Sequence, residues 1–206
     1  MIIGIAGSSG SGKTTIVNQI LSHFSSTEVT LISQDSYYKE HNHLSLLERK
    51  KLNFDHPDSI EWDLLCSQLG DLKNGKTVEQ PVYSFVESNR TNVTVTTIPA
   101  PIIIIEGILI YTQPKLRELI DKKYWIHVSN DIRLWRIILR DTSERGKSLA
   151  LTLQRYRDTV RPMHVEYIDP CIEFADELLY NDSFTEAPDT HHVVDYMKNY
   201  LIQNKY

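Results

Sequence analysis

One stretch near the N-terminus constrains the fold more than any other. An apolar run from Ile2 to Ala6 passes into a Gly/Ser loop, and residues 7–15 (Gly-Ser-Ser-Gly-Ser-Gly-Lys-Thr-Thr) fit the phosphate-binding pattern G-x-x-x-x-G-K-[ST]. Glycines let backbone N–H groups crowd a polyphosphate, and the N-terminus of a following helix favours the same anion. A Gly/Ser linker that matches by accident is the alternative, but linkers do not usually join a buried strand to an amphipathic segment.

The loop therefore predicts nucleotide binding. In this pattern Lys13 reaches the outer phosphates, and Thr14 offers its hydroxyl to Mg²⁺. The predicted nucleotide-binding residues are Gly7, Ser8, Ser9, Gly10, Ser11, Gly12, Lys13, Thr14 and Thr15.

Composition narrows the class of protein. With 206 residues and 41% hydrophobic content, one domain with a flap or lid is expected. The net charge is −5 and the 22 Lys and Arg residues form no dense run, so nucleic acid is not an expected partner. Cys66 and Cys171 lack metal-ligand spacing. No apolar run approaches the ~18 residues of a membrane span, and no leader is recognisable, so we expect a cytoplasmic protein that does not contact membranes.

Strand-like and helix-like segments alternate along most of the chain, which predicts an α/β fold with a parallel sheet. The expected strands are 2–6, 29–33, 101–107, 123–128 and 175–180, and the expected helices are 13–24, 61–72, 116–120, 130–140 and 193–202. A further helix over 148–166 should break or kink at Arg161-Pro162. Residues 81–86 and 92–98 alternate and predict a β-hairpin set apart from the sheet.

Two acids follow predicted strands, at the sheet edge where α/β proteins bind ligands. Asp35 follows strand 29–33 and could take a proton from an acceptor hydroxyl, or it could be a helix N-cap. Glu106 ends the isoleucine-rich strand and could hold Mg²⁺ beside Thr14, or it could be a buried acid satisfied by backbone N–H groups. We expect Asp35 in the metal environment as well.

Two arginines and a further acid complete the candidates. Arg140 and Arg145 could clamp a phosphoryl group, because guanidinium offers forked donors where charge accumulates, although surface arginines are often only solvated. The charged segment 141–147 contains a glycine and suits a mobile lid. Asp55 could accept hydrogen bonds from sugar hydroxyls, or it could merely initiate a turn.

Together these residues resemble the uridine kinase (uridine–cytidine kinase) family. Seven collinear stretches carry the resemblance: 7–15, Ser-Gln-Asp-Ser-Tyr-Tyr (33–38), Asn-Phe-Asp-His-Pro-Asp (53–58), Pro-Val-Tyr (81–83), Ile-Glu-Gly-Ile-Leu (105–109), Arg-Asp-Thr-Ser-Glu-Arg-Gly (140–146) and Pro-Met-His (162–164). The resemblance implies a P-loop NTPase-type fold with a five-stranded parallel sheet flanked by helices, an accessory β-hairpin over the nucleoside, and a helical lid. It also implies transfer of the ATP γ-phosphoryl group to the ribose 5′-hydroxyl of uridine or cytidine.

The resemblance also implies roles and boundaries. Asp35 corresponds to the family's base, and Lys13, Arg140 and Arg145 to its other catalytic groups. The substrate positions are Tyr38, Asp55, Tyr83, Phe85 and Arg140, and the metal positions are Thr14, Glu106 and Asp35. Residues 1–206 would form one nucleoside-kinase domain, with a hairpin flap at about 78–98 and a lid at about 140–160, and the family suggests a homotetramer. The donor would be ATP or GTP, used with Mg²⁺.

Several positions depart from the family pattern, and they keep other functions open. Ser84 and Ser88 stand where the family typically has Asp and a base-reading His, Ile137 replaces an arginine, Lys147 replaces Arg, and Arg155 replaces a Gln. The alternatives are therefore a kinase of this fold that acts on another nucleoside or riboside, and a nucleotide-binding regulatory module without efficient turnover.

Overall fold

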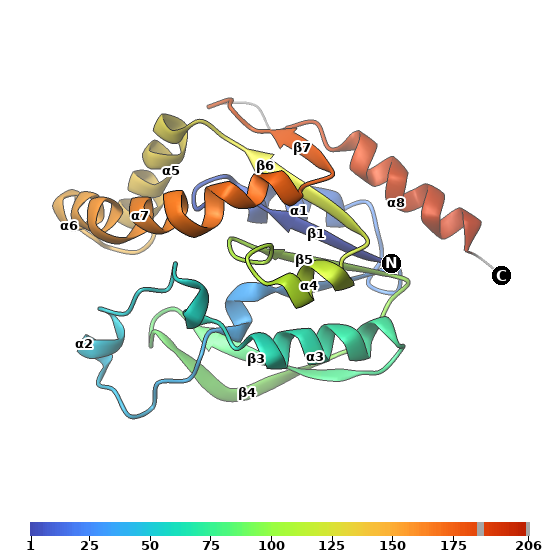
Figure 1. Ribbon diagram of the computed structural model, residues 1–206, viewed down its shortest axis with the longest axis horizontal. Coiled ribbons are helices and arrows are strands. Elements are labelled where there is room, and N and C mark those ends of the chain that lie inside the picture. The colour runs from blue at the N-terminus through green and yellow to red at the C-terminus, as the bar shows by residue number, and fades with distance from the viewer. Residues whose placement is uncertain (185–187, 205–206) are drawn as a thin grey trace.

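The computed structural model describes residues 1–184 and 188–204. Its centre is a parallel sheet of five strands, in the order β2 (Val29–Ser33), β5 (Ile102–Gly107), β1 (Ile2–Ala6), β6 (Lys122–His127) and β7 (Glu177–Tyr180) (Figure 1). All five strands were predicted. Because the strands are parallel, their carboxyl ends share one edge of the sheet, and the segments that follow β1, β2 and β5 meet there.

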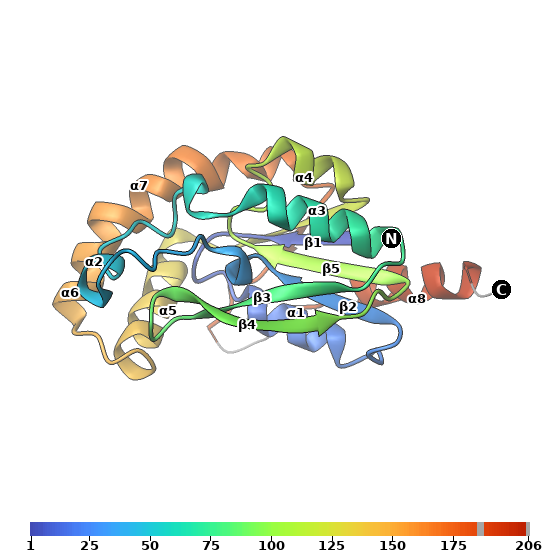
Figure 2. The same ribbon diagram turned by 90° about the horizontal axis from the view of Figure 1, so that it is seen from below.

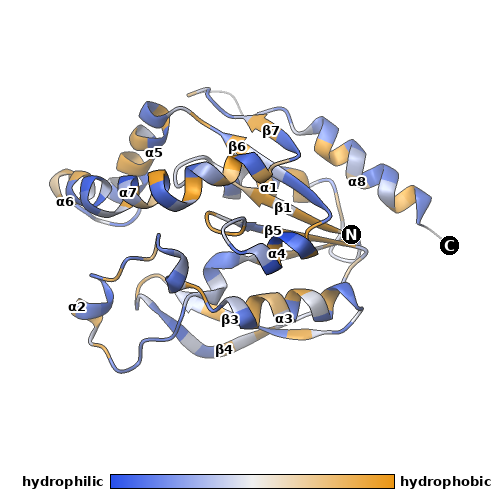
Figure 3. Ribbon diagram, in the orientation of Figure 1, coloured by the Kyte–Doolittle hydropathy of each residue, from blue (hydrophilic) through white to orange (hydrophobic). Residues whose placement is uncertain are grey.

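Helices cover both faces of this sheet. Side chains of α1 (Lys13–Leu21) and α8 (His191–Gln203) pack on one face together with Ile102 and Ile104 of β5. Side chains of α3 (Trp62–Lys73) and α4 (Pro114–Leu119) pack on the other face together with Ile103 and Ile105. Figure 3 shows the hydrophobic strands enclosed in this way. Because β5 is buried on both faces, its sequence is an unbroken run of isoleucines rather than an alternation of apolar and polar residues.

The predicted hairpin is present and lies apart from the main sheet. It consists of β3 (Val78–Ser84) and β4 (Asn89–Thr97), paired antiparallel. Its turn comes earlier than expected, because Phe85 and Val86 are exposed turn residues and not the end of a strand. The turn is closed by the Ser84 hydroxyl, which accepts a hydrogen bond from the Glu87 amide at 3.2 Å, and by Ser88, whose φ of 47° lies in the left-handed region.

A long helical arm follows β6. It comprises α5 (Asn130–Ser143), α6 (Leu149–Arg155), the π-helical η3 (Tyr156–Val160), α7 (Arg161–Met163), the π-helical η4 (His164–Ile168) and the 3₁₀-helical η5 (Asp169–Phe174). The chain does not break at Pro162, and the departure from α-geometry is a pair of π segments around it. In the first of these the Arg161 amide donates to the Tyr156 carbonyl, five residues back. This wider helical turn accommodates Pro162, which has no backbone N–H to donate.

The arm and the hairpin turn lie at the same end of the molecule. Figures 1 and 2 show α5, α6, the β3–β4 turn and the short α2 (Leu46–Arg49) together, opposite the N-terminus. The short helices η1 (Gln34–Tyr37) and η2 (Pro57–Ser59) lie along the connection from β2 to α3. Among the described residues, no helix is long and apolar enough to cross a membrane.

Candidate active site

The loop of residues 7–12 is held in a fixed shape between β1 and α1. Gly10 and Gly12 have φ values of 79° and 85°, in the left-handed region that favours glycine. The Lys13 Nζ donates to the carbonyl oxygens of Gly7, at 2.9 Å, and Ser8, at 3.2 Å. The ammonium therefore lies against the inner side of the loop, at the place where the sequence pattern expects it to meet phosphates.

Three polar residues of the helical arm, Arg133, His164 and Asp169, form a hydrogen-bonded cluster that contacts the loop of residues 7–12. The Arg133 guanidinium donates to Asp169 at 3.1 Å and to Nδ1 of His164 at 2.7 Å, and the Ser8 hydroxyl donates to the same Asp169 oxygen at 2.7 Å. Burial and the neighbouring Arg133 charge lower the pKa of His164 well below its usual range, so the ring is neutral at pH 7. Sequence reasoning assigned no role to these three residues, although His164 ends the Pro-Met-His stretch.

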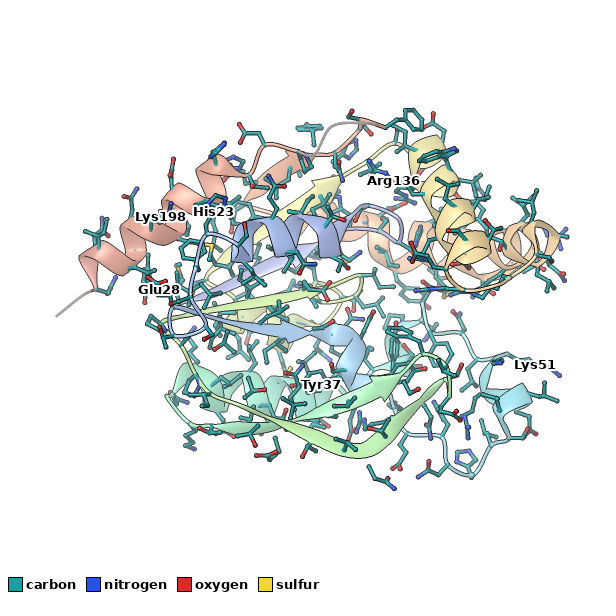
Figure 4. The ribbon with its side chains drawn as sticks, turned by 180° about the vertical axis from the view of Figure 1, so that it is seen from behind. His23, Glu28, Tyr37, Lys51, Arg136 and Lys198 are labelled. Carbon is teal, nitrogen blue, oxygen red and sulfur yellow. The ribbon has the colours of Figure 1, made fainter. Side chains whose placement is uncertain are left out.

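The opposite side of the loop is fixed from α5 and the segment after β7. Asn181 donates to the Ser11 carbonyl at 2.8 Å, and Arg136 donates to the carbonyls of Asn181 and Ser183 at 3.0 and 2.8 Å. Figure 4 shows Arg136 on the α5 side of the site and Tyr37 on the hairpin side. Ile137 is buried, and its Cγ1 would lie 3.1 Å from a methyl group added to Gly10. The residue that replaces the family's arginine thus packs against the loop.

The two predicted acids meet Lys13 at the carboxyl edge of the sheet. Ser33 and Glu106 are paired across β2 and β5, and the Ser33 hydroxyl donates to the Glu106 carboxylate. Burial, reinforced by the negative charge of Glu106, raises the pKa of Asp35 to about 6. Burial also lowers the pKa of Lys13, and the charges of Glu106 and Asp35 oppose that shift. Asp35 is not the N-cap of η1, because Ser33 occupies that position.

These groups suit Mg²⁺ bound together with a nucleotide. Mg²⁺ in phosphoryl-transfer sites usually uses one or two carboxylates together with substrate phosphates and water. Within residues 1–184 and 188–204, no three His, Cys, Asp or Glu side chains come together as a self-sufficient metal cage. The neighbouring carboxylates of Asp35 and Glu106, with the exposed Thr14 at the start of α1, match a site in which Mg²⁺ is completed by substrate phosphates and water.

The raised pKa of Asp35 predicts a pH-dependent stability difference in the ligand-free protein. The pKa rises from 3.8 to about 6 on folding, so the stability due to the protonated acid is present below pH 4 and is lost as pH rises through 6. Asparagine stays uncharged throughout. We expect Asp35→Asn to raise the free energy of unfolding by about 1–3 kcal/mol at pH 8, with no gain near pH 4.

Urea denaturation in EDTA at both pH values measures this difference, and Asn in place of the exposed Asp195 on α8 is the control. A gain of the same size at pH 4 and pH 8 would assign the effect to something other than ionisation of Asp35.

An aromatic cluster stands beside Asp35 on the hairpin side. The ring centroid of Tyr38 lies 5.2 Å from that of Phe54 and 5.0 Å from that of Tyr83, and Tyr83 lies 5.3 Å from Phe85. Phe54 was not predicted as a site residue, although it lies in the stretch 53–58 that resembles the family. The structure therefore brings the predicted residues Tyr38, Tyr83 and Phe85 together as one apolar wall.

The predicted acid Asp55 lies near this wall and is buried. Its negative charge contributes to the raised pKa of Asp35, so the two carboxylates lie near each other. The partner of Asp55 is unexpected: Arg155 of α6 donates to Oδ2 at 3.2 Å. This contact joins residues 100 positions apart in the sequence.

The predicted arginines reach the site from the arm. Both are electrostatically coupled to the groups already described: the charge of Arg140 helps to lower the pKa of Lys13, and the charge of Asp35 opposes the lowering of the pKa of Arg145 that burial causes. The Arg145 guanidinium also lies 5.7 Å from the centre of the Phe85 ring, which places it over the hairpin turn. The site therefore combines a phosphate loop, three acids, an aromatic wall and overhanging cations.

Comparison with known proteins agrees with this arrangement. The family model described as "Phosphoribulokinase / Uridine kinase family" matches residues 2–182. The chain belongs to the phosphoribulokinase/uridine kinase family. Among curated proteins it is 43% identical, over 178 residues, to uridine kinase of Staphylococcus aureus strain JH9, and the match covers 86% of each chain.

Solved structures share the fold of this phosphoribulokinase/uridine kinase family member at much lower identity. Phosphoribulokinase from Rhodobacter spheroides superposes with a TM-score of 0.63 at 16% identity, covering 87% of this chain and 69% of that one. A possible uridine kinase from Bacillus stearothermophilus gives a TM-score of 0.57 at 19% identity, covering 86% and 87%. The predicted P-loop fold, with its five-stranded sheet and separate hairpin, is therefore confirmed.

Proposed function

We propose that this kinase transfers the γ-phosphoryl group of ATP to the ribose 5′-hydroxyl of uridine, and also accepts cytidine. The 43% identity to a uridine kinase over most of the chain carries this proposal, together with the retained phosphate loop and Asp35. A different acceptor is not favoured by the relatives. Two of the residues that depart from the family pattern have structural roles in this chain. Ser84 closes the hairpin turn, and Ile137 packs against the phosphate loop.

In this mechanism the loop amides and Lys13 hold the phosphates of the donor. Thr14, Glu106 and Asp35 would hold Mg²⁺, which when bound supplies neutralisation of the phosphate charge. The acceptor rests against the wall of Tyr38, Phe54, Tyr83 and Phe85, which is suited to a flat base.

Proton transfer and charge stabilisation follow from the acids and arginines. Asp55 accepts hydrogen bonds from the ribose hydroxyls, and Asp35 accepts the proton of the 5′-hydroxyl as its oxygen bonds to the γ-phosphorus. The bond from that phosphorus to the bridging oxygen breaks, and ADP leaves. Arg140 and Arg145 stabilise the negative charge on the phosphoryl oxygens during transfer.

The boundaries and assembly belong to the same proposal. We assign residues 1–206 to one kinase domain, with a hairpin flap at about 78–98 and a lid at about 140–160. Because α5 and its connection to α6 carry Arg140 and Arg145, the cations that overhang the site, this lid is the part expected to close. A homotetramer and a cytoplasmic location are expected by analogy with the family.

The deciding experiment measures ADP release from Mg·ATP with uridine, cytidine, other nucleosides and ribosides as acceptors, and checks each product by mass. We expect uridine and cytidine monophosphate. Activity confined to another acceptor would mean that the substitutions at Ser88 and Arg155 redefine the substrate. ATP binding without product across the panel would support the regulatory-module alternative, and GTP in place of ATP tests the choice of donor.

A further inference from the structure

Asp141 is a buried acid in the last turn of α5, at the point where the arm turns toward α6. Only 1% of its side chain is exposed, whereas the residues that follow it are mostly at the surface. The chain wraps around this position, and the Lys147 amide donates to the Asp141 carbonyl at 2.9 Å. Neither the sequence motifs nor the mechanism above gives this acid a role.

Four cationic side chains converge on the Asp141 carboxylate. Oδ1 accepts from Arg140, through Nε and Nη2 at 3.2 Å each, and from Arg145 at 3.4 Å. Oδ2 accepts from the Lys147 ammonium at 3.0 Å, and the Arg155 Nη1 lies 3.7 Å from it. Each of the four side chains is itself about one-third exposed, so the carboxylate is the buried centre of a partly solvated cluster.

The charges in this cluster do not balance. Burial alone would raise the pKa of Asp141, but the hydrogen bond from Lys147 and the charges of Arg140 and Arg145 outweigh burial and lower it, so the acid is ionised at pH 7. Even with Asp55, which pairs with Arg155, two carboxylates face four cations, and the local excess of positive charge suits a highly charged anion such as a triphosphate. Without the carboxylate, the like charges would repel one another and move toward solvent.

Arg155 extends the cluster to the acceptor side. Its Nη1 faces Asp141, while its Nη2 donates to Asp55 at 3.2 Å. Arg145 likewise reaches from Asp141 to the ring of Phe85. The carboxylate thus has neighbours in both parts of the site: the arginines that face the transferred group, and the acid and ring that face the acceptor.

We propose that Asp141 is a positioning residue for phosphoryl transfer, which holds the Arg140 and Arg145 guanidinium groups over the site and, through Arg155, connects them to Asp55. The proposal rests on the proposed kinase function. Its physical basis is preorganisation: donors already fixed where charge develops stabilise a transition state without the cost of reorientation. Asp141 touches neither substrate, and it acts through the side chains that do.

The test replaces Asp141 with Asn, which keeps the size and removes the charge. We expect kcat for uridine to fall roughly 10²-fold, with KM for uridine changed less than about 5-fold. Asp141→Glu, which restores the charge, should recover at least about 10-fold of that loss. Asp158→Asn is the matched control, because Asp158 lies on the same arm in an exposed ion pair with Arg157. It should leave kcat and KM at wild-type values.

Each of the following outcomes would overturn the proposal. One is an Asp141→Asn enzyme with kcat within about 3-fold of wild type. Another is a loss of kcat that Asp141→Glu does not recover, or that follows a matching fall in melting temperature, since both indicate a purely structural acid. The last is a rate of tryptic cleavage after Arg145 and Lys147 that is the same in ligand-free Asp141→Asn as in wild type. If Asp141 holds these side chains, its loss should free them, and trypsin should cleave the peptide bonds that follow them faster.

The cleavage measurement does not depend on the identity of the acceptor, so it separates this proposal from the proposed function. If wild-type enzyme is active only on another acceptor from the panel, the kinetic comparison is made with that acceptor. If the wild type turns over no acceptor, the result counts against the kinase function, but the cleavage rate still decides whether Asp141 holds the cations.

Discussion

Replacing Asp35 with Asn is expected to lower kcat for uridine about 10³-fold while leaving the fold and ATP binding intact. General-base assistance contributes roughly 10²–10⁴-fold, and an amide cannot take up the proton of the 5′-hydroxyl. The change removes a carboxylate that burial and Glu106 already disfavour in its charged form. The variant should therefore be at least as stable as wild type at pH 8, which separates loss of chemistry from loss of structure.

Steady-state kinetics with uridine and a fluorescent ATP analogue measure the two effects. Turnover within 10-fold of wild type would remove Asp35 from the role of base. A parallel loss of nucleotide affinity would instead assign Asp35 mainly to the Mg²⁺ environment that we propose for Asp35 and Glu106.

Replacing Gly10 with Ala is expected to disrupt the phosphate loop. A Cβ at this position would lie 2.7 Å from the Arg133 carbonyl oxygen, which belongs to the backbone of α5, so the loop or the helix must shift. The left-handed φ of 79° adds about 1–2 kcal/mol for a non-glycine residue. We expect a loss of at least about 3 kcal/mol in the free energy of unfolding, and roughly 10²-fold in ATP affinity.

Gly75 provides the matched control for this prediction. It has nearly the same backbone angle, a φ of 78°, but no atom of residues 1–184 or 188–204 lies within 4 Å of an added Cβ. Gly75→Ala should cost only the backbone term of about 1–2 kcal/mol and leave ATP affinity unchanged. Equal destabilisation by the two substitutions, measured by urea unfolding, would show that the contact with α5 does not matter.

Residues placed by strand geometry were the ones that sequence reasoning located well. Asp35 and Glu106 follow buried strands, and parallel strands deliver their carboxyl ends to one edge, so the strand pattern predicts that both acids lie at that edge. The structure adds that β2 and β5 are neighbours in the sheet. The phosphate loop is likewise a local pattern, because its shape depends on glycines a few residues apart.

Residues whose role depends on distant partners were missed. The support of the loop by His164 requires η4 to pack against Ser9, and the pairing of Arg155 with Asp55 requires α6 to reach the connection after β2. Such contacts leave no periodic signal in the chain. The turn of the hairpin was misplaced for a different reason, since the apolar character of Phe85 and Val86 outweighed the turn chemistry of Ser84 in the sequence pattern.

The order of the strands has a consequence for how acceptor choice can change. β2 and β5 are neighbours in the sheet, and everything between them, residues 34–101, forms a single crossover that contains Asp35, Tyr38, Phe54, Asp55 and the hairpin. The loop of residues 7–12 lies outside this crossover. The residues that we assign to the acceptor therefore lie on one continuous connection, whereas the phosphate loop and the arginines Arg140 and Arg145 lie outside it, so sequence changes within the connection can alter the acceptor side without altering the loop.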